Sequence, residues 1–351
     1  MSISFPASAL IENIRIPNVL LKAVVLPPQL PSNIWIQFSG VKDSTAAALM
    51  TKRIYGETGI PIQAHHQIVE EDWAGTVEHC KRVCEMLGIP LVCEQAHYLG
   101  YECRYNDCRH HWLSTKPKPK CQKCKREDAG EIIAEVVNLR GLLMWRKRWP
   151  DYGRNRYCTA YLKREVFDKF ARRHRAEWGN FPIAVMGERW LESTSRAKIP
   201  YLEERRGVKA MWDWHPILHL RRLDAFRLVR DNGLPLHECY RLQGMTDRDM
   251  FETDAEKGGG RMSCVCCIFK SAEAVAHDLV LDLPHNQQVT RDLVAIEAET
   301  RHYFKQGLGI EAILAGQRKA IVVNAPSSST PLILRGKKST ADSDQVQLTL
   351  F

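Results

Sequence analysis

The stretch Ile34-Trp35-Ile36-Gln37-Phe38-Ser39-Gly40-Val41-Lys42-Asp43-Ser44-Thr45 joins an apolar run to a polar loop, and the helix-forming residues 46–59 follow it. The apolar run predicts a buried strand. Ser39 and Gly40 are small enough to let the backbone approach an anion, and Ser44 and Thr45 add hydroxyl donors. The N-terminus of the next helix presents unpaired N–H groups and a favourable dipole. The stretch therefore predicts a polyphosphate site.

Two charged residues in this loop extend the prediction. Lys42 can place a positive charge beside a phosphate. Asp43 would repel phosphate unless a cation lies between them, which indicates Mg²⁺. The Walker A pattern GxxxxGK[ST] is absent, so this is a phosphate loop of another kind.

The same rhythm of strand and helix continues along the chain. Apolar residues 61–68, 89–93 and 181–186 predict further strands, and residues 78–87 predict a helix between the first two of them. Alternating strands and helices at this spacing favour a doubly wound parallel α/β sheet. Three segments differ: residues 100–130 interrupt the alternation, residues 270–315 indicate helices, and the polar composition after about residue 324 is typical of a disordered tail.

Composition excludes several classes of protein. The chain has 351 residues, of which 44% are hydrophobic and 26% charged, as in ordinary globular proteins. No apolar run approaches the ~18 residues that span a bilayer, so no membrane partner is expected. The N-terminus lacks the pattern of a signal peptide, which favours a cytoplasmic protein. A net charge of +9 favours an anionic partner.

Basic residues concentrate between Arg140 and Arg175, where Trp145, Trp149, Tyr152, Tyr157 and Tyr161 are interleaved with them. The set is Arg140, Arg146, Lys147, Arg148, Arg154, Arg156, Lys163, Arg164, Lys169, Arg172, Arg173 and Arg175. Two interpretations stay open. The stretch is either a solvated helix face or a surface that follows a nucleic-acid backbone and stacks its bases.

Four cysteines lie within the interrupting segment in the pattern Cys103-x4-Cys108-x12-Cys121-x2-Cys124. Two cysteine pairs around a Lys- and Pro-rich connector indicate a tetrahedral Zn²⁺ site. His110 and His111 are alternatives for one ligand. Such a site could clamp the insertion or hold nucleic acid.

Several motifs resemble one enzyme family. Phe38 to Thr45 resembles the SGGxDS PP-loop of ATP pyrophosphatases, with Val41 at the second glycine. Three further segments resemble the phosphoadenosine phosphosulfate (PAPS) reductase-like branch: Gly187 to Arg196, Trp214 to Gly244, and Arg261 to Ile268 with its C-x-x-C-I ending. The resemblance covers roughly residues 32–270. It implies an adenine nucleotide alpha hydrolase-like fold, with the nucleotide at the carboxyl ends of the strands.

The resemblance also implies a reaction. A substrate oxygen attacks the α-phosphorus of ATP, pyrophosphate leaves, and the adenylylated substrate accepts a nucleophile, with sulfur favoured. The implied nucleotide-binding residues are Ser39, Gly40, Val41, Lys42, Asp43, Ser44 and Thr45, and the implied catalytic residues are Lys42, Asp43, Arg189 and Arg196. Asp43 would face Mg²⁺, while Arg189 and Arg196 would face phosphate or a substrate anion. Glu192 would orient Arg196 or form a structural ion pair.

Two other functions stay open. Sulfonucleotide reductases use a nucleophilic cysteine on a C-terminal tail, and no cysteine follows Cys267 here. A nucleotide-sensing DNA-binding regulator would keep the fold without turnover. The basic stretch, the zinc insertion and the C-terminal motif favour DNA over tRNA or a small molecule as the substrate. The chain resembles the relatives that install sulfur in DNA, which implies a sulfur-donor protein as a further partner.

In those relatives a cysteine in an aromatic-Cys-Thr context joins a C-x-x-C pair on an iron–sulfur cluster. Here Tyr157-Cys158-Thr159 has that context, and Cys264 and Cys267 form the pair. Cys239 or Cys266 would supply the fourth thiolate of a [4Fe–4S] cluster. A second zinc or a redox disulfide between Cys264 and Cys267 are the alternatives.

The chain ends in Gln347-Leu348-Thr349-Leu350-Phe351. This sequence resembles the peptide by which bacterial DNA polymerases and repair proteins bind the sliding clamp. Leu350 and Phe351 would fill an apolar pocket, with Gln347 and Leu348 beside them. The alternative is a hydrophobic terminus that folds back on its own domain.

These predictions divide the chain into seven regions. They are an N-terminal segment (1–30), the first part of a nucleotide-binding core (31–100), a zinc-binding insertion (101–126), the second part of the core with the basic stretch (127–235), a cysteine motif (236–275), a helical region (276–322) and a disordered tail (323–351).

Overall fold

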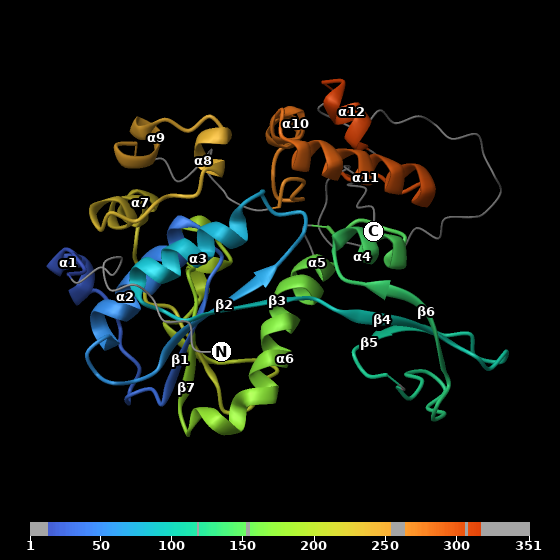
Figure 1. The fold of residues 1–351 in the computed structure, drawn as a ribbon, viewed down its shortest axis with the longest axis horizontal. Coiled ribbons are helices and arrows are strands. Elements are labelled where there is room, and N and C mark those ends of the chain that lie inside the picture. Colours follow the sequence, from blue (N-terminus) through green and yellow to red (C-terminus); the bar gives the residue numbers. More distant parts are fainter. Residues whose placement is uncertain (1–12, 118, 152–154, 254–263, 306–307, 317–351) are drawn as a thin grey trace, which may run out of the picture. The chain divides into compact units, whose positions relative to one another are not determined.

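A six-stranded sheet with the order β3-β2-β1-β7-β9-β8 forms the core (Figure 1). The computed structural model describes residues 13–316, except 118, 152–154, 254–263 and 306–307. The strands are β1 (Asn33–Gln37), β2 (Ile62–Ile68), β3 (Leu91–Gln95), β7 (Pro182–Val185), β8 (Leu202–Glu204) and β9 (Trp212–Trp214). All neighbouring pairs are parallel except β8 with β9. The predicted parallel α/β sheet is confirmed, with one antiparallel edge strand.

Alternation along β1 explains why helices cover both faces of the sheet. Ile34 and Ile36 are fully buried in a cluster with residues of α2 (Lys42–Tyr55), α3 (Thr76–Leu87) and α7 (Arg222–Asp231). Trp35 points to the opposite face, where its ring lies 4.8 Å from Phe170 of α6 (Glu165–His174). The sheet is therefore doubly wound. β1 lies between β2 and β7, so the loop after β1 is central.

A separate antiparallel sheet with the order β5-β4-β6 carries the cysteine-rich insertion. Its strands are β4 (Tyr98–Cys103), β5 (His111–Ser114) and β6 (Gly130–Val136), and β4 starts three residues after β3 ends. Gly130 meets Tyr101 so closely that an added Cβ would lie 2.6 Å from its ring. The antiparallel sheet begins before residue 101 and ends after residue 126, so it is longer than the predicted insertion at both ends.

The C-terminal part of the described chain is helical, as predicted. It contains α10 (Ala272–Val280), α11 (Pro284–Thr300) and α12 (Ile310–Leu314), and α11 also packs against α4 (Leu139–Arg146). The remaining helices are short: α1 (Asn18–Lys22), α5 (Tyr157–Thr159), α8 (Cys239–Leu242) and α9 (Asp247–Phe251), with a π-helical turn at Ala160–Arg164 and 3₁₀ turns at Arg175–Trp178, Trp190–Glu192 and Arg196–Lys198. None of the described helices is long and apolar enough to cross a membrane.

Glu297 of α11 links the C-terminal helices and makes them sensitive to pH. Its carboxylate accepts hydrogen bonds from the backbone N–H groups of Phe304 (2.6 Å) and Ile310 (2.7 Å). Burial raises the pKa of Glu297 to about 7, although these two N–H donors oppose the rise.

A carboxyl group with a raised folded-state pKa favours folding while it is protonated. Its contribution is complete below the ordinary value of 4.5 and is lost as the pH rises through about 7. Thermal unfolding between pH 4 and 8 should therefore show this region losing stability on the alkaline side. The Glu297→Gln variant should show a flatter profile, and an equal slope in both proteins would contradict the assignment.

Candidate active site and metal centre

The loop between β1 and α2 takes a shape that requires glycine at one position. Gly40 has a φ of +72°, and an added Cβ would lie 2.8 Å from the Cys80 sulfur and 3.1 Å from the His79 ring. His79 Nε2 donates to the Gly40 carbonyl oxygen at 3.0 Å. Val41, which occupies the second glycine position of the PP-loop pattern, has an extended backbone with φ of −83°. Because any residue adopts that conformation, valine is tolerated there.

Hydrogen-bond donors gather at the start of α2. The Ser44 hydroxyl lies 3.2 Å from the Ser39 hydroxyl, and it donates to the Val41 carbonyl at 3.1 Å. The Lys42 N–H donates to the Tyr240 hydroxyl at 3.1 Å. The N–H groups of Asp43 and Ser44 have no hydrogen-bond partner among the described residues. The unpaired N–H groups of Asp43 and Ser44, in the first turn of α2, are suited to binding an anion.

Asp43 joins two buried cations in this loop. Its carboxylate lies 2.7 Å from Lys42 Nζ and 2.7 Å from Arg189 Nε, and the three residues are 7%, 6% and 3% exposed. Burial favours the neutral form of Asp43, but Lys42 and Arg189 outweigh burial and lower its pKa. Burial also lowers the pKa of Lys42. In this arrangement Asp43 holds Lys42 and Arg189 in place. Mg²⁺ binding by Asp43 stays a prediction, since the carboxylate would have to exchange one of these partners.

The two predicted catalytic arginines are joined through Glu192. Arg189 Nη2 lies 3.6 Å from one Glu192 oxygen, and Arg196 forms a close ion pair with the other. Arg196 also lies 3.8 Å from Glu188, whose second oxygen is 3.2 Å from His215 Nδ1. Arg189 is buried, whereas the Arg196 side chain is 32% exposed. Arg196 is therefore the more accessible of the two to a ligand.

Gly187 brings this arginine segment against α2. It follows β7, and a Cβ added to Gly187 would lie 2.9 Å from both the backbone nitrogen and the Cα of Ser44. From β1 the chain continues to β2 and then β3 along one direction of the sheet. β7 lies next to β1 in the opposite direction, so the strand order reverses between β1 and β7. Open α/β sheets bind ligands at the carboxyl ends of the strands at such a switch point.

A methyl group at Gly187 should therefore disturb the loop. Gly187→Ala would force backbone atoms apart at Asp43 and Ser44, so we expect at least tenfold weaker ATP binding, or about 1.4 kcal/mol. Isothermal titration with Mg-ATP measures this, and Gly141→Ala serves as the control because its added Cβ meets no atom closer than 3.3 Å. Equal affinity in Gly187→Ala and the wild type would contradict the site.

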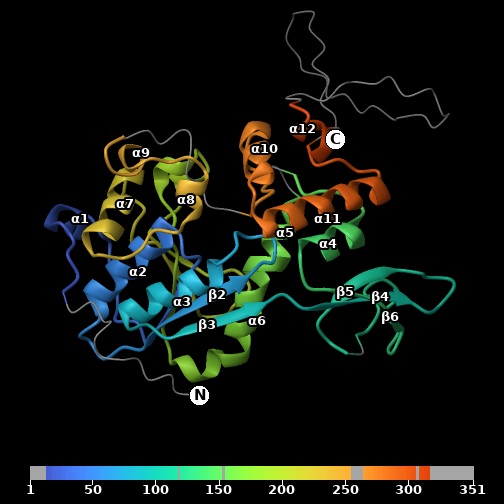
Figure 2. The ribbon, with the colours of Figure 1, turned by 45° about the horizontal axis from the view of Figure 1, so that its top comes forward.

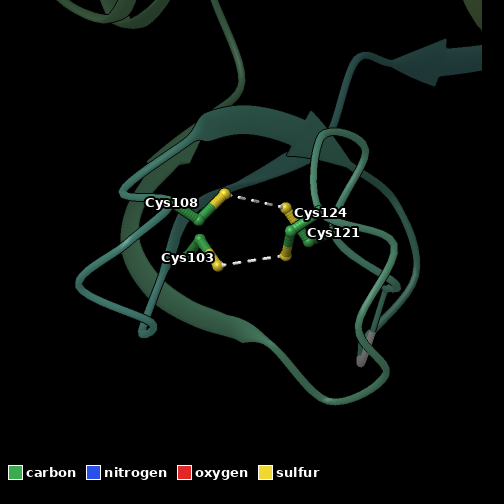
Figure 3. Close-up of side chains that lie close together, drawn as sticks. All are labelled: Cys103, Cys108, Cys121 and Cys124. Carbon is green, nitrogen blue, oxygen red and sulfur yellow. Dashed lines mark hydrogen bonds between the residues drawn. The ribbon is translucent and has the colours of Figure 1, made fainter.

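The four insertion cysteines converge into a group that could hold a metal ion (Figure 3). The sulfurs of Cys103 and Cys124 are 3.8 Å apart, those of Cys108 and Cys121 are 3.7 Å apart, and all four lie within 4.8 Å of one another. A tetrahedral zinc with Zn–S bonds of about 2.3 Å requires sulfur separations of about 3.8 Å. The spacing therefore fits Zn²⁺.

The surroundings support this assignment. Burial opposes ionisation of the Cys121 thiol, but N–H groups of Cys124 and Lys123 outweigh it and lower the pKa to about 6. The two alternative ligands point elsewhere: His110 stacks on Trp112, and His111 lies 3.5 Å from Glu102. No second group of three or more ligands converges in this way within the described parts of the chain.

Three cysteines of the second set, Cys158, Cys264 and Cys267, act electrostatically on Lys163. Asp72, 3.7 Å away, raises the pKa of Lys163, and the thiols of Cys264, Cys267 and Cys158 add to this effect. Cys239 and Cys266 are buried. Burial raises the pKa values of Cys158, Cys239, Cys264 and Cys266. Three of the predicted cluster ligands thus share one charged neighbour, and the iron–sulfur cluster stays a prediction.

Much of the basic stretch binds other parts of the protein. Arg140 pairs with Asp292, Lys147 with Glu299 and Lys163 with Asp72. Arg175 donates to three backbone carbonyls. These contacts leave fewer cations for a ligand than the sequence suggests.

Two predicted motifs cannot be placed. Residues 347–351, with Gln347, Leu348, Leu350 and Phe351, lie outside the described residues, as do Arg261, Met262 and Ser263 of the cysteine motif. Sequence reasoning also missed His79, which carries no motif signal; only the packing of α3 against the loop places it at Gly40.

Comparison with solved structures gives distant similarities. FMN adenylyltransferase from Candida glabrata is 10% identical over 62% of this chain and 52% of that chain, with a TM-score of 0.35. Its complex with FAD and inorganic pyrophosphate is 11% identical over 64% of this chain and 59% of that chain, with a TM-score of 0.38. Phosphoadenylyl-sulfate (PAPS) reductase from Candida auris, in a phosphate complex, is 13% identical over 70% of this chain and 96% of that chain, with a TM-score of 0.35. This chain thus spans about half the length of the adenylyltransferase.

No curated protein matches this chain. Residues 33–253, more than half of the chain, match the phosphoadenosine phosphosulfate reductase domain, and this range contains the β1–α2 loop, Gly187, both arginines and Tyr240. The match is to the family as a whole and selects no branch of it. The chain belongs to the phosphoadenosine phosphosulfate reductase domain family.

Proposed function

We propose that this protein binds ATP at the β1–α2 loop, releases pyrophosphate and adenylylates a nucleic-acid substrate for sulfur transfer. The observation that carries the proposal is the loop itself. Unpaired N–H groups of Asp43 and Ser44 lie beside the ammonium of Lys42 and the guanidinium of Arg189, at the switch point of the sheet. Such donors stabilise the charge that develops on a leaving pyrophosphate.

The proposed chemistry has two steps. An oxygen of the substrate forms a bond to the α-phosphorus of ATP while the bond to the β-phosphate oxygen breaks, and pyrophosphate leaves with its electron pair. A sulfur nucleophile from a donor protein then forms a bond to the substrate atom that carries this oxygen, and AMP leaves with the oxygen and its electron pair. The chain's own part is to bind and orient, with Lys42 and the loop amides on the β- and γ-phosphates and Arg196 on a substrate anion. When bound, Mg²⁺ would neutralise phosphate charge.

The thiols beside Lys163 fit the same proposal. Cys158, Cys264 and Cys267 share this ammonium, and either Cys239 or Cys266 would complete a four-thiolate set for a [4Fe–4S] cluster. The Lys163 side chain is 40% exposed, and its ammonium would offset part of the negative charge of nearby thiolates. Protein purified without oxygen should contain iron that depends on Cys158, Cys264 and Cys267. Absence of iron after anaerobic reconstitution would leave zinc or a disulfide at this place.

The substrate class is tested on its product. Protein, Mg-ATP and a sulfur donor are incubated with DNA or RNA, and the digested nucleic acid is analysed by mass spectrometry. The proposal predicts a sulfur-containing nucleotide that is absent without ATP and absent with Ser44→Ala. Sulfite formed from PAPS or adenylyl sulfate, without modified nucleic acid, would establish a sulfonucleotide reductase instead. ATP binding with neither product would indicate a nucleotide-sensing regulator.

We also propose DNA as the favoured nucleic acid and a sliding clamp as a partner of residues 347–351. The full chain should bind purified bacterial clamp, and changing Leu350 and Phe351 to Ala should abolish the binding. Equal binding by that variant would remove the clamp from the proposal.

A further inference from the structure

A cavity of about 560 Å³ lies beside edge strand β3, between α6 and the end of β5. Figures 1 and 2 show α6 alongside β3, which leads into β4 of the insertion. Val166 and Tyr98 contribute buried apolar surface to the lining. Four cations, Lys116, Lys169, Arg172 and Arg173, line the same space. We call this space the β3 groove.

The fold brings these cations together from two separate parts of the chain. Lys169, Arg172 and Arg173 are spaced i, i+3 and i+4 on α6 and share one face of the helix. Lys116 comes from the insertion, where the buried Tyr101 hydroxyl bonds the Lys116 and Pro117 carbonyl oxygens at 2.8 and 2.9 Å. This anchor holds the backbone of Lys116 beside the cysteine site. Lys116 is exposed, and the ion pairs of the neighbouring cations in the insertion are made by Lys120 and Arg126 instead.

The β3 groove keeps an excess of positive charge. Among its lining residues only Glu94 is a carboxylate, and it pairs with Arg173. Arg172 uses one N–H group on the Gly207 carbonyl, which leaves the rest of its guanidinium available. Lys169 lies 3.6 Å from the centre of the Tyr98 ring and 3.7 Å from Glu165. Burial lowers the pKa of Lys169 to about 8, and Arg172 and Arg173 contribute, so an added anion would stabilise its charged form.

The position of the β3 groove connects it to the nucleotide loop. Glu94, Gln95 and His97 lie at and just beyond the carboxyl end of β3, and the β1–α2 loop follows the carboxyl end of β1. All three strands β1, β2 and β3 are parallel, so both features lie at the same edge of the sheet. Two strand spacings amount to about 10 Å. A chain molecule held in the β3 groove could therefore extend to the phosphate loop.

We propose that the β3 groove binds the phosphodiester backbone of a single-stranded nucleic acid. The proposal rests on the proposed function for the choice of nucleic acid as the ligand. Guanidinium groups bind phosphate oxygens in a bidentate way, and ammonium groups act as point charges. A cavity of this volume is in the range of small-ligand pockets, so it fits one or two nucleotides of a strand rather than a duplex. A second cavity, of about 370 Å³, is lined by three carboxylates and one arginine, so its net negative charge would repel phosphate: Glu70, Glu71, Asp292 and Arg140.

The test measures binding of fluorescent 20-nucleotide single-stranded DNA, and of RNA with the same sequence, over a range of salt concentrations. The groove variant is Lys116→Gln with Arg172→Gln. The matched control is Lys52→Gln with Arg53→Gln, which removes the same charge at the far end of α2. We expect the groove variant to bind roughly tenfold or more weakly, with a salt slope lower by about 1.4, since each phosphate contact on a single strand contributes about 0.7.

The outcomes separate this proposal from the proposed function. ATP binding, measured on the same proteins, should be equal in the wild type, the groove variant and the control. Loss of strand binding in the groove variant supports the groove even if the wild type binds no ATP. Strand binding that is equal in all three proteins overturns the groove even if ATP is bound. Displacement of the strand by polyglutamate as effectively as by unlabelled DNA of equal charge would overturn it in favour of an acidic peptide. The nucleic acid that binds more tightly, DNA or RNA, identifies the kind of strand that the β3 groove prefers.

Discussion

Loss of one zinc ion and unfolding of residues 98–136 are the expected results of changing Cys121 and Cys124 to Ser. The four sulfurs already stand at the spacing of a tetrahedral zinc site, and the cluster around them is small, with only Tyr101, Cys103, Trp112, Cys121 and Ala129 buried in it. Structural zinc contributes about 10–16 kcal/mol to the folding of such small units. The antiparallel sheet β5-β4-β6 should therefore depend on the metal.

Metal analysis and limited proteolysis measure this result. The double variant should lose its zinc and be cleaved within β4 to β6, whereas Cys93→Ser, outside the cluster and only partly buried, should keep both zinc and resistance. A double variant with full zinc content and the proteolysis pattern of the wild type would show that the insertion folds on its own packing.

Asp43→Ala is expected to lower the free energy of unfolding by about 3–5 kcal/mol, because it leaves the buried cations Lys42 and Arg189 without their shared partner. It should also abolish turnover, since both cations belong to the proposed phosphate site. The wild type should lose the same contribution in acid. The pKa of Asp43 is lowered on folding, so its stabilisation is present above the ordinary value of 3.8 and is lost as the pH falls through the folded-state pKa.

Urea denaturation measures the loss, with Asp231→Asn as the matched control. Asp231 pairs with Arg230 at the surface, where both side chains are about half exposed, so this variant should change stability by about 0–1 kcal/mol. If Asp43→Ala costs no more than the control, the three charges are not coupled as described.

The main features of the fold could be predicted because local pattern and tertiary structure agree. The apolar run before Ser39 becomes β1, and the cysteine spacing predicts the convergent four-cysteine group without any knowledge of the sheet that carries it. Charge partners could not be predicted. The segment after β7 brings Arg189 to Asp43 from 146 residues away, and Mg²⁺ binding by Asp43 stays a prediction. Long-range contacts of this kind depend on how the strands are ordered, which no local pattern encodes.

The basic stretch is a second case in which long-range contacts could not be predicted from the sequence. Its sequence suggests one continuous surface, but the structure directs Arg140 and Lys147 to α11 and Arg175 to backbone carbonyls. The cations of α6 combine instead with Lys116, which lies outside the stretch. Only the position of the insertion beside β3 brings these charges together.

The measurement that tests the central claim most directly is exchange of radiolabelled pyrophosphate into ATP. The protein is incubated with Mg-ATP, labelled pyrophosphate and single-stranded nucleic acid, and the label in ATP is counted. Reversible attack at the α-phosphorus predicts labelled ATP with the wild type and none with Ser44→Ala. Release of inorganic phosphate without exchange would mean attack at the γ-phosphorus, and it would contradict the assignment of the β1–α2 loop as a pyrophosphate-releasing site.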